Sequence, residues 1–329
     1  MKRVLFLLAI LLPLAGKTQV FYADGMQFRV NTDGKAVVVG YKKDAYLGVL
    51  NVPKVVEYQG TSYDVVEIES YAFNNCQELG YITIPFTIEK IGNAAFRGCT
   101  NLDVAEFIGC TPVHGPKEIG DYAFAETGLL TFHVPSSVTK LGGFVFYKCK
   151  KLSSLLGLFG LEKIPVGMCR GCEKLIAFHI PTNIKKIEDY AFAECDFHTV
   201  RFPHSIEALG YYIFQGNRNI TKVTARMFDP CSLPESSFDA DIYDRCLLAV
   251  PIGYFQIYKN KEYWNKFINV REEEDDEEDE TSVGNIQGGS KAQATYYSID
   301  GKRFPSAQKG LNIVKTADGR TKKVNVKMK

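Results

Sequence analysis

Residues 181–195 read Pro-Thr-Asn-Ile-Lys-Lys-Ile-Glu-Asp-Tyr-Ala-Phe-Ala-Glu-Cys, and close variants of this stretch recur through the middle of the chain. Its phenylalanine is one of a set of equivalent residues separated by intervals of 23, 28, 22, 23, 23, 22 and 24 residues. The set is Phe73, Phe96, Phe124, Phe146, Cys169, Phe192, Phe214 and Phe238. A fixed period near 23 residues is typical of a stacked solenoid, so the sequence predicts one.

Each repeat also keeps other positions in register with the phenylalanine. In five repeats a cysteine follows three residues later, at Cys76, Cys99, Cys149, Cys172 and Cys195. Residues three apart share one face of a helix, so we predict a short helical turn around each phenylalanine. The next residues, as in 79–85 and 175–181, alternate apolar and polar side chains and end at proline, which predicts a half-buried β-strand.

The unit P-x-x-[IV]-x-x-[IL]-x-x-x-A-F-x-x-C-x-x-L-x-x-x-x-[IV] resembles the BspA-type leucine-rich repeat, a family of secreted and surface proteins. The resemblance extends over residues 20–270, with about eight repeats in 65–251. An insertion at 108–116 and a poor strand at 155–161 depart from the pattern. The resemblance implies a leucine-rich-repeat solenoid of short β-strands and helical turns.

Both ends of the repeat array carry sequences that would shield its core from water. Residues 19–64 contain an Asp33-Gly34 turn between alternating apolar residues, which predicts an N-terminal β-hairpin cap. Residues 248–251 are predicted as the last strand, and 252–270 as an aromatic C-terminal cap. The cap residues are Tyr254, Phe255, Tyr258, Tyr263, Trp264, Phe267 and Ile268. An exposed aromatic site for sugar is the alternative interpretation of this set.

The first residues indicate the compartment. Lys2-Arg3 precede a short apolar run, 4–12, followed by Pro13 and small residues, which predicts a secretory signal peptide over residues 1–18. The run is too short to span a bilayer comfortably, and no other long apolar segment follows. We therefore expect an exported protein, at the cell surface or extracellular, with no transmembrane segment after signal cleavage.

Export makes the nine cysteines disulfide candidates. Those at the repeat position are predicted to be unpaired core residues, because side chains stacked in parallel point the same way. Cys169 and Cys172 form a C-x-x-C, which suggests a redox or metal motif, although the repeat accounts for both positions. Cys231 and Cys246 lie outside the ladder and are the best candidates for a disulfide.

Catalytic motifs are absent from the sequence: there is no G-x-S-x-G, H-E-x-x-H or glycine-rich phosphate loop. His133 and His179 occupy the outward position of strands two repeats apart, which places them about 10 Å from each other. That separation is too large for two ligands of one metal ion. The sequence predicts no enzyme, no cofactor and no metal site.

The predicted strands offer a continuous sheet face, the kind of surface on which solenoids commonly bind ligands. Alternate residues point outward. One outward row is Thr83, Glu106, His133, Leu156, His179, Arg201 and Thr224, and the next is Tyr81, Val104, Thr131, Ser154, Ala177, Thr199 and Lys222. The candidate binding residues are the tyrosine and the polar members apart from Ser154. A solvated face without a ligand is the alternative.

The composition changes after Val270. Nine consecutive acidic residues, 272–280, predict an acidic linker over 271–291, because the charges repel and nothing apolar can be buried. Residues 292–329 contain two predicted hairpins, at Asp300-Gly301 and Asp318-Gly319. From residue 282 to the end, ten Lys or Arg face two Asp, a net charge of +8. A basic tail suggests a nucleic-acid partner, but the signal peptide argues against one.

This basic segment resembles the short C-terminal β modules of exported Bacteroidetes proteins, some of which are sorting signals for type IX secretion. The whole sequence therefore predicts an exported leucine-rich-repeat binding protein. The family resemblance implies adhesion to a host or bacterial surface protein or glycan. The alternatives are a structural or accessory envelope protein without a specific ligand and, less directly, a carbohydrate-processing accessory module.

Overall fold

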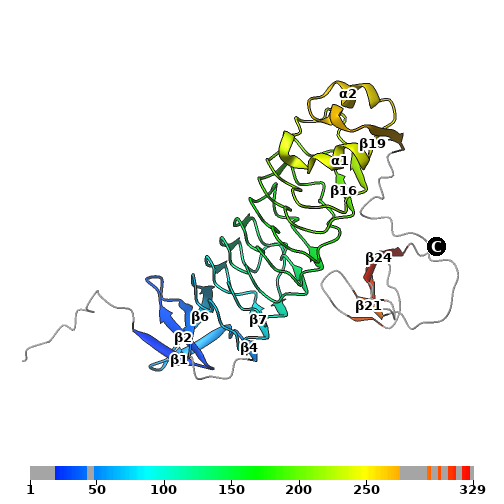
Figure 1. Cartoon of the computed structure of the whole chain (residues 1–329). Coiled ribbons are helices and arrows are strands. Elements are labelled where there is room, and N and C mark those ends of the chain that lie inside the picture. Colours follow the sequence, from blue (N-terminus) through cyan, green and yellow to red (C-terminus); the bar gives the residue numbers. More distant parts are fainter. Residues whose placement is uncertain are drawn as a thin grey trace, which may run out of the picture.

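The computed structural model describes residues 19–42 and 48–274, together with strand residues 295–297, 303–304, 310–315 and 321–326. The predicted signal peptide and most of the predicted acidic linker lie outside the described residues. Within residues 19–274, about nine coils stack in one direction, from the β1 end to the α2 end in Figure 1. The predicted repeat solenoid is confirmed.

One side of the stack is lined by the longer strands, which pair in parallel from coil to coil. β4 (Val49–Asn51), β7 (Tyr81–Pro85) and β9 (Val104–Ile108) form one sheet, and β11 (Thr131–His133) and β13 (Ser154–Leu156) form another. A third contains β16 (Thr199–Phe202), β18 (Lys222–Ala225), β19 (Leu247–Pro251) and β20 (Asn269–Glu273). We call the outward side of these strands the strand face.

The strand face is interrupted, so the prediction of a continuous sheet is wrong. Residues 175–181 form no strand, although their sequence alternates as expected. The preceding strand, β13, ends at Leu156, and the next residue, Gly157, adopts a φ of 101°, a conformation open mainly to glycine. A Cβ at Gly157 would lie 2.3 Å from the Val134 carbonyl oxygen. The next coil therefore has no extended neighbour beyond Leu156.

Two-residue strands form a second ladder on another side of the coils. β3 (Ala36–Tyr41), β6 (Thr61–Ile68), β8 (Lys90–Ile91), β10 (Glu118–Ile119) and β12 (Lys140–Leu141) pair in parallel, the first two being longer. β14 (Lys163–Ile164), β15 (Lys186–Ile187) and β17 (Ala208–Leu209) form a separate sheet of the same kind. The aliphatic residue of each short strand is buried in the core, whereas the residue before it reaches the surface.

The phenylalanine ladder forms the centre of the core, as predicted. Phe73, Phe96 and Phe124 are fully buried, and their nearly parallel rings have centroids 5.2 and 5.0 Å apart. Cys169 interrupts the stack, which resumes from Phe192 onward. Each repeat of about 23 residues therefore forms one coil, and each coil that has a phenylalanine adds one ring to the stack.

The turns around the phenylalanines are not helical, contrary to the prediction. In seven successive coils, the residues two before and two after the phenylalanine position have positive φ, as at Tyr71 (63°) and Asn75 (58°). Alternate N–H groups therefore point along the stack. Phe73 N–H donates to the Ala95 carbonyl at 2.8 Å, and Asn75 N–H donates to the Arg97 carbonyl at 2.7 Å. We call this side of the array the turn side.

At the N-terminal end, β2 (Met26–Val30) pairs with β1 (Val20–Ala23) and with β3, antiparallel in both cases. Gly34, with a φ of 70°, lies in the connection between β2 and β3, where the sequence predicts the hairpin turn. β3 then pairs in parallel with β6, which also forms an antiparallel pair with β5 (Val55–Tyr58). The hairpin is thereby joined to the first coil.

The C-terminal end contains η1 (Glu235–Ser237), α1 (Ala240–Arg245), α2 (Phe255–Asn260) and η2 (Trp264–Lys266). Tyr258, Trp264 and Phe267 are fully buried. The Tyr258 hydroxyl donates to the Met227 carbonyl at 2.8 Å, and Trp264 Nε1–H donates to the Cys231 carbonyl at 2.9 Å. These three rings therefore pack into the end of the core. Tyr254, Phe255 and Tyr263 of the predicted cap are partly buried, and Ile268 is 65% exposed.

The parallel ladder continues beyond the strand that the sequence predicts as the last. β20 pairs with β19 through five residues, from Asn269 to Glu273. The paired region therefore includes residues 271–273, which the sequence assigns to the linker.

The C-terminal segment forms its own antiparallel sheet in the order β22-β21-β23-β24. β21 (Thr295–Tyr297) pairs with β22 (Arg303–Phe304), and β23 (Gly310–Lys315) pairs with β24 (Thr321–Val326). Both predicted hairpins are therefore present as strand pairs. Their Asp-Gly turns lie outside the described residues.

Candidate binding surface

The predicted outward rows are in register wherever the strands pair. Thr83 lies opposite Glu106, and the same relation holds between successive members in the other paired strands. One row begins a coil earlier than predicted, because Asn51 lies opposite Thr83 and accepts a hydrogen bond from Thr83 Oγ1 at 2.8 Å. His179 belongs to residues 175–181, which form no β-strand, so its position is not set by strand pairing.

The candidate residues differ in exposure. Those with exposed side chains are Glu106, Thr131, His133, His179 and Thr199, and those partly buried are Tyr81, Thr83, Arg201 and Lys222. The Tyr81 hydroxyl donates a hydrogen bond to the Glu106 carboxylate of the next coil, and this bond raises the pKa of Tyr81. Neighbouring coils are therefore linked by side chains as well as by backbone on this face.

Thr224 is 9% exposed and does not belong to the accessible face, so this prediction is wrong. β20 and Glu274, the residue after it, place acidic residues beside Lys222 and Arg226. Lys222 Nζ pairs with Glu273 at 2.7 Å, and the Arg226 guanidinium donates to the Glu274 carbonyl at 2.7 Å. The accessible strand face therefore ends near Arg201.

The cysteines are core residues with a repeated hydrogen bond. Cys99 Sγ–H donates to the Phe73 carbonyl of the preceding coil at 3.0 Å, and Cys149, Cys172 and Cys195 make the equivalent bond. Burial raises the pKa of the Cys169 and Cys172 thiols, both fully inaccessible. A reactive C-x-x-C needs an accessible thiol of lowered pKa, so these two residues are not suited to redox chemistry.

The disulfide candidates Cys231 and Cys246 are both free thiols in the structure. Cys246 is buried and Cys231 is half-buried. Within the described part of the chain, no group of three His, Cys, Asp or Glu side chains is placed to bind a metal ion.

The turn side carries an aromatic row that sequence reasoning missed. Five of the seven residues two positions before the phenylalanine position are aromatic: Tyr71, Tyr122, Phe144, Tyr190 and Tyr212. Tyr122 stacks on Phe144 at 5.1 Å, and Tyr190 stacks on Tyr212 at 4.8 Å. The Arg97 guanidinium lies 5.6 Å from the Tyr122 ring centroid. The recurrence of these aromatic residues is visible in the sequence. The row was missed because we predicted a helical turn, whose residues do not have left-handed φ.

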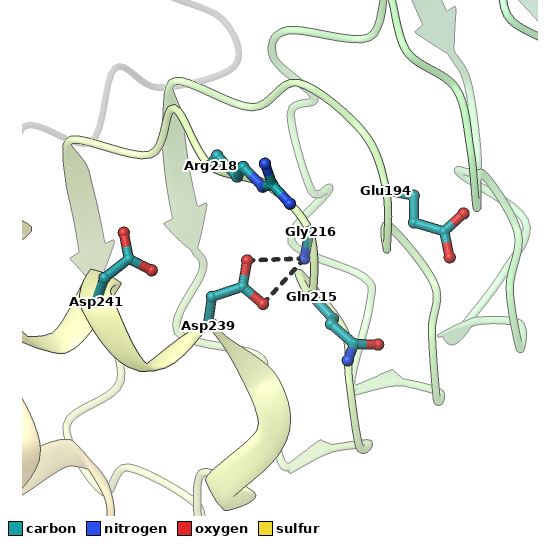
Figure 2. A pocket seen from close by; sticks show the side chains of 6 residues that line it. All are labelled: Glu194, Gln215, Gly216, Arg218, Asp239 and Asp241. Atoms are coloured by element: carbon teal, nitrogen blue, oxygen red, sulfur yellow. Dashed lines mark hydrogen bonds between the residues drawn. The ribbon is translucent and has the colours of Figure 1, made fainter.

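Hollows open at both ends of the turn side. The C-terminal hollow, of about 590 Å³, is lined by Glu194, Gln215, Gly216, Arg218, Asp239 and Asp241 (Figure 2). Its carboxylates already have partners: Asp239 accepts from Gly216 N–H at 3.0 Å, Glu194 pairs with Arg170, and Asp241 pairs with Arg245. The N-terminal hollow, of about 550 Å³, lies between the β1–β3 hairpin and the first turn.

Short strands that pair in parallel from coil to coil around a ladder of buried apolar side chains define a leucine-rich-repeat protein. The chain belongs to the BspA-type leucine-rich repeat family. Six copies of the sequence profile "BspA type Leucine rich repeat region" match residues 66–175, 110–221 and 162–241, which together cover more than half of the 329 residues.

A solved structure shares the fold at low sequence identity. A leucine rich cell surface protein from Faecalibacterium prausnitzii A2-165 is 19% identical, covers 78% of this chain and 73% of its own, and gives a TM-score of 0.58. A leucine-rich repeat protein from Bacteroides ovatus ATCC 8483 is 21% identical, with coverages of 77% and 76% and a TM-score of 0.47. A search of curated proteins finds no match. Among the described residues, no helix combines the length and apolar character needed to cross a bilayer.

Proposed function

We propose that the protein is an exported adhesion protein that holds a host or bacterial surface protein against its strand face. The observation that carries this proposal is a set of exposed aliphatic side chains on that face. They are Val49, Val104, Ile108 and Leu156, with exposed fractions of 64%, 39%, 42% and 58%. Exposed apolar groups that cluster on a regular face are typical of interaction surfaces.

The surroundings of these aliphatic residues favour a protein partner. Glu106, Thr131 and Thr199 lie on the same face and add polar side chains that can form hydrogen bonds beside the aliphatic ones. Apolar contact area with a polar rim is the usual composition of a protein interface. The signal peptide predicted from the sequence supports export, and the similar protein from F. prausnitzii is named a cell surface protein.

The strand face can be blocked without disturbing the core. In the double variant Thr131→Arg/Thr199→Arg, both substitutions lie at exposed positions, so we expect thermal unfolding within a few degrees of the parent. Binding to immobilised mucin and extracellular-matrix proteins should fall by about tenfold or more, because the added side chains prevent close contact. Thr139→Arg, at an exposed position next to the second ladder, is the matched control and should bind like the parent.

The same measurement separates the proposal from its alternatives. Full binding by the double variant would move the site away from the strand face. Absence of binding to every immobilised protein would favour a structural envelope protein without a specific ligand. Binding retained by residues 19–274 alone would assign it to the repeat array rather than to the basic C-terminal segment.

A further inference from the structure

We propose that the N-terminal hollow of the turn side binds a neutral oligosaccharide, with Tyr22 and Tyr71 as the aromatic contacts of a sugar ring. Its volume of about 550 Å³ lies within the range of roughly 300–1,000 Å³ that holds small ligands. The hairpin and the first turn of the repeat array both supply lining residues. The site is separate from the strand face and does not depend on the proposed adhesion function.

The two tyrosines expose aromatic rings from two different parts of the fold, the N-terminal hairpin and the first turn of the repeat array. Tyr22, from β1, is 59% exposed, and Tyr71, from the first turn, is 63% exposed. Tyr71 has a φ of 63°, which is unfavourable for a bulky residue, and its N–H is bonded to the Asn93 carbonyl of the next coil at 3.0 Å. The stacked turn thus holds Tyr71 in place. The apolar C–H face of a pyranose packs well on such rings.

Amide side chains in the lining match sugar hydroxyls, which both donate and accept hydrogen bonds. Gln27 and Asn74 line the hollow, and Gln27 Nε2 donates to the Tyr22 hydroxyl at 2.7 Å. Gly40 leaves room for this pair, because a Cβ there would lie 2.8 Å from Gln27 Oε1. The position of Tyr22 is therefore supported by the hairpin beneath it.

Tyr41 connects the hollow to the core. It lines the hollow, and its ring stacks on Phe73, the first ring of the ladder, with centroids 5.9 Å apart. Burial raises the pKa of Tyr41 to about 12, so its hydroxyl remains protonated at neutral pH. One wall of the hollow is thus in contact with the buried phenylalanine ladder.

The charge of the lining favours a neutral ligand. Among the described residues, Lys42 is the charged member of the lining and no carboxylate contributes. The described lining offers no counter-charge to a cation, and sulfate or phosphate groups are usually held by several cationic donors. The C-terminal hollow in Figure 2 differs in both respects, because carboxylates line it and aromatic rings do not.

The test uses the full mature chain on an array of neutral and acidic oligosaccharides that includes maltotetraose, chitotetraose and N-acetyllactosamine chains. We expect binding to a neutral member, followed by titration calorimetry with that oligosaccharide. Tyr22→Ala and Tyr71→Ala should each weaken it by about tenfold. Tyr211→Ala removes a tyrosine that is 60% exposed elsewhere on the turn side, so it is the matched control and should bind like the parent.

Three results would overturn the proposal: no binding to any neutral oligosaccharide, equal binding by the Tyr22 and Tyr71 variants, or equal loss in the Tyr211 variant. Tyr22 and Tyr71 are both exposed, so thermal unfolding of the variants should match the parent. A loss of binding would then not reflect misfolding. The strand-face double variant should bind the oligosaccharide normally. Oligosaccharide binding by this double variant would show that the sugar site works independently of the strand face, so the two proposals can fail separately.

Discussion

At the scale of single residues, the position three after the phenylalanine position supplies a hydrogen-bond donor to the preceding coil in five coils. In most coils the donor is a cysteine thiol, but Asn217 takes the same place and donates through Nδ2 to the Phe192 carbonyl at 2.8 Å. A thiol is a weak donor and an amide is a strong one. Where the bond between coils is made, a small buried side chain with a polar hydrogen is enough, and sulfur is not needed.

Asn217→Ala should leave two buried backbone groups without their described partner. Besides the Phe192 carbonyl, the Phe197 N–H donates to Asn217 Oδ1 at 3.1 Å. Each buried group left unpaired costs about 1–3 kcal/mol, so urea unfolding should show a loss of that order or larger. Asn217→Cys restores the donor alone and should fall between Ala and the parent. A Cys variant no more stable than Ala would contradict this role.

The sequence predicted the burial of these cysteines but not their hydrogen bonds. Spacing identified Cys99 and Cys149 as core residues, because they recur with the buried phenylalanine. The bond to a carbonyl of another coil depends on how the coils are stacked, which the spacing of one chain does not contain. The aromatic row was missed for a related reason, since left-handed φ is normally assigned to glycine or asparagine.

At the scale of elements, the turns show where local rules were overridden. Gly98, Gly171 and Gly216 occupy left-handed positions as expected, but Tyr122 and Tyr190 hold the same conformation with bulky side chains. Ring stacking and hydrogen bonds between coils offset the local cost there. These interactions are tertiary, so the i, i+3 spacing alone was misread as a helical turn.

The last strand of the repeat array, β20, was not predicted either, because its final residues begin the acidic run. Glu272 Oε1 accepts hydrogen bonds from Gly253 N–H at 2.9 Å and Phe255 N–H at 3.0 Å, and Glu273 pairs with Lys222. Composition suggested repulsion among these carboxylates. Pairing with groups from other coils makes the first of them part of the folded array.

A fragment of residues 19–274 should therefore be more stable than one of residues 19–268. Removing β20 exposes the edge of β19 and deletes the Glu272 and Glu273 contacts. We expect the shorter fragment to unfold roughly 5–10 °C lower by circular dichroism, and to be cut sooner by protease. The longer fragment serves as the control. Equal unfolding temperatures would show that the folded array ends before residue 269.

At the scale of the whole molecule, strand alternation was enough to predict the outward rows, because a period of two fixes which side chains share a face. It could not reveal that the face is interrupted at residues 175–181 or that β20 continues the ladder beyond β19. Both features depend on contacts between coils. The N-terminal hollow was equally invisible, since Tyr22 and Tyr71 come together only when the hairpin docks on the array.

The buried thiols should make the array sensitive to high pH. Burial raises the pKa of Cys99 from 9.0 to about 12, and it also raises the pKa values of Cys149, Cys169, Cys172 and Cys195. Thiols of the unfolded chain ionise above about pH 9 while the folded ones stay protonated. The stabilisation is therefore complete below pH 9 and is lost progressively as the pH rises toward 12.

Urea unfolding between pH 8 and pH 11 should show this decline, with each such thiol contributing a slope of at most about 1.4 kcal/mol per pH unit. The double variant Cys149→Ala/Cys172→Ala is less stable at neutral pH but should lose stability less steeply. Tyrosine and lysine ionisation is common to both proteins, so the difference in slope isolates the thiols. Equal slopes would mean that the thiols are accessible in the folded state.

The hydrogen bonds that run from coil to coil on the turn side also determine how the array would respond to a pulling force. A load applied between the two ends acts along these bonds, so it separates them one row at a time instead of shearing many together. Each coil that opens would release about 23 residues, or roughly 75–80 Å of extended chain. Under tension the molecule would lengthen stepwise and dissipate energy at each step, as a molecular shock absorber does.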